Sequence, residues 1–219
     1  KRVEASSLIA RSGVADVLVK VTTEDGIVGW GECTRAADVP GIESAVNAMA
    51  PLVVGRSAWD REIMQRELAV YAVWAFQPMT ANFAFAGIDM ALWDACGKAC
   101  GQPLYRLWGG AWRDPIEICA YLLESDRDKC VADAKDFQKR GYTSFKLKIG
   151  FDEPSDIALT RAVRDAIGPA APLRLDVNGA WTPGTARRQL RKLAEYDPFY
   201  VEQPLEHDED LIGELLLEA

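Results

Sequence analysis

Four charged residues stand near the ends of three short apolar segments. Lys146 and Lys148 belong to the first segment, Asp176 to the second and Glu202 to the third. Carboxylate oxygens are the hard ligands that Mg²⁺ prefers, so Asp176 and Glu202 could fill two positions of its octahedral shell, with water and substrate oxygens in the others. The same four charges could instead form a structural ion-pair network, and the pattern alone leaves both interpretations open.

These charges are expected to share one face of a sheet, because successive side chains of a strand point to opposite faces. Active sites of parallel α/β folds lie at the carboxyl ends of their strands. Burying a lone charge is costly, so the two lysines and the two acids are expected to pair there. The alternation places Glu117, Cys119 and Tyr121 opposite Ile116, Ile118 and Ala120; Lys146 and Lys148 opposite Phe145, Leu147 and Ile149; Arg174, Asp176 and Asn178 opposite Leu173, Leu175 and Val177; and Tyr200 and Glu202 opposite Phe199 and Val201. In each segment the apolar face is the one that helices would cover.

The segments belong to an array of strands and helices that begins after Pro115. Short apolar strands alternate there with helical patterns, which is typical of a parallel α/β sheet. Gly141 and Gly168 stand where helices commonly end. Four strands do not close an eight-stranded barrel, so this part is predicted to be half a barrel, an open sheet or a fragment. Strands are expected at 116–121, 144–149, 173–178 and 199–202, and helices near 126–140, 155–167 and 182–195.

The preceding residues follow a different pattern. Residues 14–32 predict a β-hairpin, with its turn at Glu24-Asp25-Gly26, and Gly29 and Gly31 are expected to be turn glycines. Helical apolar spacing predicts helices at 42–52, 60–74 and 84–99, the last of them apolar nearly all round and therefore buried. The sequence thus predicts an α+β domain over residues 1–112, followed by a barrel-type α/β domain over residues 113–219.

The composition limits the class of partner. The net charge is −8 and there is no basic run, which argues against nucleic-acid binding. No apolar stretch approaches the roughly 18 residues of a membrane span, and the first residues lack the apolar region of a signal peptide. The five cysteines form no CxxC pair, so a disulfide framework or zinc ribbon is not expected. This usage fits a reducing cytoplasm.

Five short motifs resemble, in their order and spacing, the mandelate racemase and muconate lactonizing enzyme family of the enolase superfamily. They are Gly29-Trp30-Gly31-Glu32, the segment from Ala86 to Gly110, Lys146-Leu147-Lys148, Asp176-Val177-Asn178 and Val201-Glu202-Gln203-Pro204. The resemblance implies an α+β capping domain on a modified TIM barrel, (β/α)7β, with only about the first half of the barrel present in this chain. Residues 5–13 are short for the mobile lid loop of that family.

The resemblance also implies an isomerase or lyase that removes the proton next to a substrate carboxylate. The reaction depends on Mg²⁺ and gives a metal-stabilised enediolate, which leads to racemisation, epimerisation, cycloisomerisation or dehydration. Lys148 matches the catalytic base, and Lys146 matches its partner, which contacts the substrate carboxylate and lowers the pKa of the base. Asp176 and Glu202 match two metal ligands, and Asn178 matches a residue beside the metal or the intermediate. The implied partner is a small-molecule carboxylate, and a homo-oligomer is left open because family members are commonly oligomeric.

Two other functions stay open. Lys146 or Lys148 could be the Schiff-base nucleophile of a metal-free barrel lyase, as in class I aldolases, although acids on the next two strands argue against it. The chain could also be a non-catalytic truncated remnant, because half a barrel has an exposed sheet edge and an incomplete metal site. The third acidic ligand and the second acid–base group of the family are expected on later strands.

Overall fold

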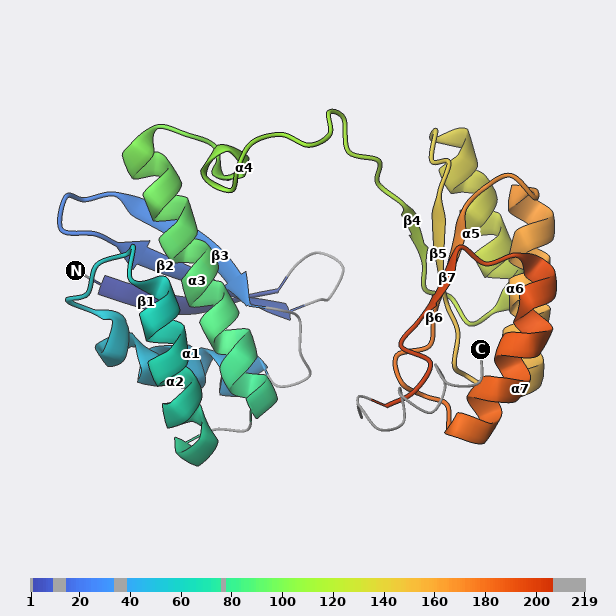
Figure 1. Cartoon of the computed structure of the whole chain (residues 1–219), viewed down its shortest axis with the longest axis horizontal. Helices are drawn as coiled ribbons and strands as arrows, with labels where there is room; N and C mark the ends of the chain where they lie inside the picture. Colours follow the sequence, from blue (N-terminus) through green and yellow to red (C-terminus); the bar gives the residue numbers. More distant parts are fainter. Residues whose placement is uncertain (1, 10–14, 34–38, 76–77, 207–219) are drawn as a thin grey trace. The chain divides into compact units, whose positions relative to one another are not determined.

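The computed structural model describes residues 2–9, 15–33, 39–75 and 78–206. Contacts divide the chain into two compact units, Lys1–Asp114 and Pro115–Ala219 (Figure 1). Each unit has its own hydrophobic core. Within the described residues, no helix combines the length and the apolar character needed to cross a membrane.

The first unit contains an antiparallel sheet with the strand order β1 (Arg2–Ile9), β2 (Ala15–Thr22) and β3 (Val28–Cys33). β2 and β3 form the predicted hairpin, and its turn holds Gly26 at φ 84°, a conformation that glycine adopts without steric cost. β1 was not predicted, and it pairs with β2 along its whole length. Of residues 5–13, which are short for the lid loop of the resembled family, residues 5–9 belong to this strand and the other four lie outside the described residues.

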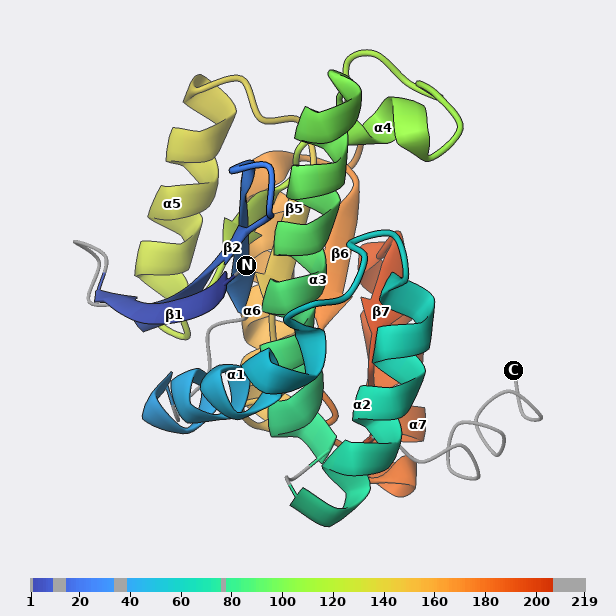
Figure 2. The same ribbon diagram turned by 90° about the vertical axis from the view of Figure 1, so that its left-hand side faces the viewer.

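In the described part of this unit, four helices accompany the sheet: α1 (Val39–Val53), α2 (Arg61–Ala75), α3 (Pro78–Cys100) and α4 (Leu104–Leu107). The three helices predicted from apolar spacing are confirmed. In Figure 2, α1 and α2 flank the long helix α3, which contacts both of them. The core between the sheet and the helices includes Val17, Val19, Ile42, Met49, Met64, Leu68, Ile88 and Leu92.

Glycines allow α3 to pack directly on β3. A Cβ atom on Gly29 would lie 2.0 Å from the carbonyl oxygen of Ala91, and one on Gly31 would lie 2.0 Å from the carbonyl oxygen of Gly87. The prediction that Gly29 and Gly31 are turn glycines is wrong, because both lie inside β3. Their function in the fold is to bring the strand and the helix backbone together.

The second unit is a parallel sheet with the strand order β4 (Ala120–Leu122), β5 (Phe145–Lys148), β6 (Leu173–Asp176) and β7 (Tyr200–Glu202). The connections are α5 (Arg127–Lys139), α6 (Glu153–Ile167) and α7 (Pro183–Leu193), which continues into the 3-10 turn η1 (Ala194–Tyr196). All three α-helices lie on the same side of the sheet (Figure 1). The predicted parallel array is confirmed, and the apolar face of β5 and β6 is fully buried against the helices.

Local sequence signals define the ends of these helices. The side chains of Asp126, Asp152 and Thr182 each accept a hydrogen bond from a backbone N–H three residues later, at the starts of α5, α6 and α7. Gly141 and Gly168 follow α5 and α6 with φ values of 92° and 83°. The glycines predicted at the helix ends therefore have a positive φ, which glycine adopts without steric cost.

The first predicted strand of the array is only partly right. β4 begins at Ala120, which lies opposite Phe145, the first residue of β5. Residues before Ala120 therefore have no partner in β5, and Ile116 and Ile118 are 75% and 72% exposed. Phe199, which was also expected to face the helices, is exposed instead.

Candidate active site

The register of the second sheet brings the predicted residues together. Lys148 pairs with Asp176 across β5 and β6, and Asp176 pairs with Glu202 across β6 and β7. Because the three strands are parallel, these residues all stand at the carboxyl edge of the sheet. Lys146 lies two residues before Lys148 and shares its face.

Lys146 links the two carboxylates. Its Nζ lies 3.1 Å from Oδ2 of Asp176 and 2.8 Å from Oε2 of Glu202. Lys148 Nζ lies farther away, 3.8 Å from Oδ1 of Asp176. The Asp176 side chain is only 2% exposed, whereas that of Glu202 is 39% exposed. The charges thus form one cluster, in which a buried carboxylate is shared by two lysines.

The cluster perturbs the two lysines in opposite directions. Burial lowers the pKa of Lys148, the Lys146 ammonium adds to this effect, and the charge of Asp176 opposes it without reversing it. Burial also disfavours the charged form of Lys146, but its contacts with Glu202 and Asp176 outweigh burial and raise its pKa. For Asp176, the two lysines outweigh the burial that would raise its pKa, and hold that pKa below its usual value. Lys148 is therefore the lysine that loses its proton more easily.

Tyr121 and Asn178 complete the surroundings of Asp176. The Tyr121 hydroxyl donates a 3.1 Å hydrogen bond to Oδ2 of Asp176, and Lys146 Nζ lies 5.2 Å from the centre of the Tyr121 ring. Asn178 donates to Oδ1 of Asp176 from its side-chain amide at 2.8 Å and from its backbone N–H at 3.1 Å. Asn178 has a φ of 49°, which brings both donors back toward the strand end. Tyr121 was not among the predicted site residues, although strand alternation placed it on the charged side of the sheet.

The chemistry of Asp176 and Glu202 suits a divalent cation, but these two residues do not fill its coordination shell. Asp176 and Glu202 offer carboxylate oxygens, the ligand type that Mg²⁺ prefers, and both lie within 3.1 Å of one ammonium nitrogen, so a single cation can contact both. In the part of the chain that the structure describes, no group of three or more His, Cys, Asp or Glu residues could hold a metal ion. Water and substrate oxygens, or further residues, would have to supply the other positions.

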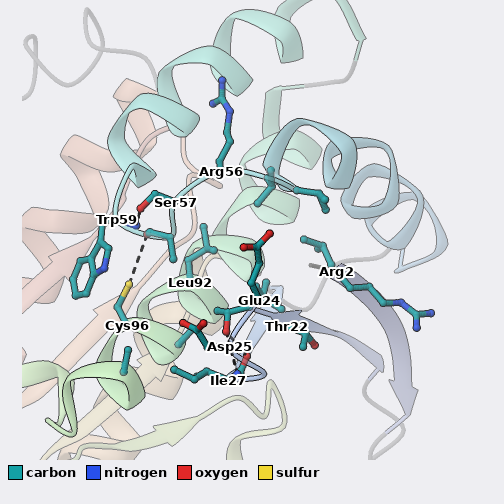
Figure 3. A pocket seen from close by; sticks show the side chains of 18 of the residues that line it. Arg2, Thr22, Glu24, Asp25, Ile27, Arg56, Ser57, Trp59, Leu92 and Cys96 are labelled. Carbon is teal, nitrogen blue, oxygen red and sulfur yellow. Dashed lines mark hydrogen bonds between the residues drawn. The ribbon is translucent and has the colours of Figure 1, made fainter.

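The first unit contains a cavity of about 420 Å³ that holds none of these residues (Figure 3). Its walls are the β2–β3 turn, the connection between α1 and α2, and one side of α3. Glu24 and Asp25 line it from the β2–β3 turn, and Leu92 and Cys96 line it from α3. Both acids are exposed, and the residues that line the cavity include no buried charged group that could do chemistry.

Two family models match the chain. The mandelate racemase / muconate lactonizing enzyme N-terminal domain matches residues 5–109, and the enolase C-terminal domain-like model matches residues 129–215. The chain belongs to the mandelate racemase and muconate lactonizing enzyme family. This confirms the family that the five motifs indicated.

Among curated members of this family, an L-Ala-D/L-Glu epimerase of Bacillus subtilis is 34% identical over 207 residues, which cover 90% of this chain and 54% of the epimerase. Other curated relatives are named as racemases and dehydratases. The chain spans about half the length of the curated relatives that it matches.

Solved structures of the family superpose closely. A mandelate racemase/muconate lactonizing enzyme from Bordetella bronchiseptica has a TM-score of 0.88 and 31% identity, with coverage of 100% of this chain and 62% of that one. A mandelate racemase/muconate lactonizing protein from Paracoccus denitrificans, complexed with magnesium, has a TM-score of 0.84 and 29% identity, with coverage of 99% and 62%. The two units thus have the capping and barrel-type folds of the family.

Proposed function

We propose that this protein removes the proton next to the carboxylate of a small substrate, with Lys148 as the base and with Mg²⁺ held by Asp176 and Glu202. The observation that carries the proposal is the contrast between two lysines on one strand. Lys146 is held charged by two carboxylates, whereas Lys148 has a lowered pKa and lies beside the same cluster.

Lys148 is suited to accept a proton at Nζ. A general base must be largely unprotonated near the working pH, and the burial of Lys148 favours its neutral form. Its Nζ is buried and makes no hydrogen bond to any described residue, so the nitrogen lone pair is not engaged by a donor. Oδ1 of Asp176 lies 3.8 Å from this Nζ, which is beyond hydrogen-bond distance.

Lys146 is suited to a different task. Its ammonium stays charged and stands beside the buried Asp176, where it can attract a substrate carboxylate. Removal of the α-proton spreads a second negative charge onto that carboxylate, and fixed positive charges stabilise it where it develops. Bound Mg²⁺ would supply further positive charge at the carboxylate oxygens.

The proposal extends to the fold and the reaction class. The four parallel strands are taken as the first half of a (β/α)7β barrel, and a third carboxylate ligand and a second acid–base group are expected from strands beyond β7. The names of the relatives support racemisation, epimerisation or dehydration, and a neighbouring structure is named as a cycloisomerase. The substrates proposed are small carboxylates such as dipeptides, N-acylated amino acids and sugar acids.

Exchange of the substrate α-proton with deuterated water tests this proposal. The complete protein is incubated with Mg²⁺ and a panel of these carboxylates, and exchange is followed by NMR. Exchange should require Mg²⁺, disappear with EDTA and be lost in Lys148→Ala. Exchange that persists in EDTA, or full activity of Lys148→Ala, would refute the assignment.

A control variant should separate chemistry from folding. Arg188 and Glu153 form an exposed ion pair in the same unit. Arg188→Met should keep the exchange rate, because this pair lies outside the cluster of lysines and acids. Equal loss in both variants would show that the loss is not specific to Lys148 and would remove this support for its role as the base.

A further inference from the structure

We propose that Asp156 is a positioning residue, whose carboxylate fixes the loop after β5 against the loop after β6 and so sets Lys148 relative to Asp176. This inference rests on the proposed function, because it concerns the geometry of that site. Asp156 lies in the first turn of α6 and touches none of the four charged site residues in any contact that the structure gives.

The carboxylate of Asp156 joins two loops. One oxygen, Oδ1, accepts hydrogen bonds from the backbone N–H groups of Gly150 at 2.9 Å and Phe151 at 3.1 Å. The other oxygen, Oδ2, accepts from the indole Nε1 of Trp181 at 3.4 Å. Gly150 stands two residues after Lys148, and Trp181 belongs to the loop that follows Asp176. A single side chain therefore ties together the segments that leave both strand ends.

The loops that Asp156 joins are packed against one another. Gly150 has a φ of 96°, and a Cβ atom there would lie 2.8 Å from the carbonyl oxygen of Val177 and 3.1 Å from Cβ of Ala180. The backbone N–H of Trp181 donates in turn to the carbonyl oxygen of Pro204 at 3.3 Å, two residues after Glu202. Contacts thus run from the end of β5 through the end of β6 to the end of β7.

Capping of α6 does not explain a buried carboxylate at Asp156. Asp152 already caps the helix, since its side chain accepts from the backbone N–H of Ser155 at 3.2 Å. Every hydrogen bond that the structure gives to the Asp156 carboxylate comes from the two loops and none from the helix. Asp156 is completely buried, and burial raises its pKa in spite of three donors. A buried carboxylate is expensive, and what it achieves here is the connection between the loops.

Replacement of Asp156 by asparagine tests the connection with almost no change in volume. The amide oxygen can still accept hydrogen bonds from the Gly150 and Phe151 N–H groups. The amide NH₂ then faces the Trp181 indole N–H, and two donors cannot form a hydrogen bond with each other. A displacement of about 1 Å in a reacting group can cost about 100-fold in rate. We therefore expect D156N to lower kcat for α-proton exchange by about 10- to 100-fold, with KM close to that of the wild type because Asp156 does not touch substrate.

Two further variants separate positioning from folding. Trp181→Phe removes the indole donor and should lower kcat in the same way. In the double variant D156N/W181F, the fold-loss in kcat should be smaller than the product of the two single losses, because both substitutions break the same hydrogen bond. Val163→Ala is the matched control: Val163 is also completely buried on α6 and belongs to the core rather than to the loops. V163A should keep the wild-type kcat per folded molecule. Loss of kcat in V163A equal to that in D156N would overturn the inference.

Amide hydrogen exchange in the complete protein provides a readout that does not depend on activity. D156N should speed exchange in residues 149–152 and 177–182, whereas V163A should not do so selectively. The inference would be overturned if these loops exchanged in D156N at the rates of the wild type, or if D156N kept the kcat of the wild type. If the wild type fails to exchange any substrate α-proton while D156N loosens the loops, the proposed function fails and the connection between the loops stands.

Discussion

Replacing Lys146 with methionine removes the cation that links Asp176 and Glu202 while keeping an unbranched side chain of similar length. Two ion pairs, at 3.1 Å and 2.8 Å, are lost together. Among the described residues, Asp176 then keeps only the more distant Lys148 as a cationic partner, together with its hydrogen bonds from Tyr121 and Asn178. The two carboxylates are then left with excess negative charge.

The size of the effect follows from burial. Breaking a fully buried ion pair by removing one partner costs about 3–5 kcal/mol, because the remaining charge is left uncompensated. Asp176 is almost fully buried, but Glu202 is 39% exposed and Lys146 is 20% exposed, so water screens part of the loss. We expect K146M to lower the free energy of unfolding by about 2–3 kcal/mol in EDTA. The exposed pair between Arg188 and Glu153 gives the control, since water screens it and R188M should lower the free energy of unfolding far less than K146M.

Magnesium should restore part of this stability. A ligand that binds only the folded state stabilises it by about 2.7 kcal/mol when its concentration is 100 times its Kd. Because the ammonium no longer neutralises the two carboxylates, Mg²⁺ should raise the stability of K146M more than that of the wild type. The assay is urea unfolding followed by circular dichroism, in EDTA and in excess Mg²⁺, for wild type, K146M and R188M. A loss in K146M no larger than in R188M, or a loss that Mg²⁺ does not reduce, would refute the view that these carboxylates share Lys146 and can share a divalent cation.

Three other perturbations test separate parts of the structure. Tyr121→Phe should lower the free energy of unfolding by about 0.5–1.5 kcal/mol through loss of its hydrogen bond to Asp176; urea midpoints equal to those of the wild type would contradict this. Gly31→Ala should destabilise the first unit by about 3 kcal/mol, as followed by thermal unfolding, because the new Cβ would overlap the Gly87 carbonyl oxygen. Gly184→Ala, where the new Cβ has no neighbour closer than 3.6 Å, should be neutral or slightly stabilising in the same measurement. The exchange rate of the wild type should fall as pH drops through the lowered pKa of Lys148, since only the neutral amine accepts a proton; a rate that rises as pH falls there would exclude Lys148 as the base.

Much of the second unit could be predicted because its local signals agree with its tertiary structure. Apolar alternation marked the strands, and Asp152 and Gly168 marked the ends of α6. The strand at residues 116–121 was overestimated because alternation does not show where a pairing partner begins. The chain turns before Phe145, so residues such as Ile118 have no partner in β5, whatever their own pattern.

The close contact of β3 with α3 could not be read from local sequence. Gly29 and Gly31 look like turn residues, because glycine is common wherever the backbone turns. Their actual requirement comes from a helix about 60 residues away, whose carbonyl oxygens leave no room for a side chain. In the same way, Trp181 and Asp156 form no short motif, and only the packing of the loops brings the indole N–H to the carboxylate.

Side-chain alternation placed Lys146 and Lys148 on one face, but it could not show that their pKa values are shifted in opposite directions. The difference arises from the offset of two residues along β5. Lys146 reaches forward, toward the carboxyl ends of the strands, to two carboxylates, and both contacts favour its ammonium form. Lys148 stands at the strand end beside one carboxylate at a longer distance, where burial is the larger effect and favours the neutral amine. One strand can therefore supply a fixed positive charge and a proton acceptor side by side, and the proposed removal of a carbon-bound proton next to a carboxylate would use both.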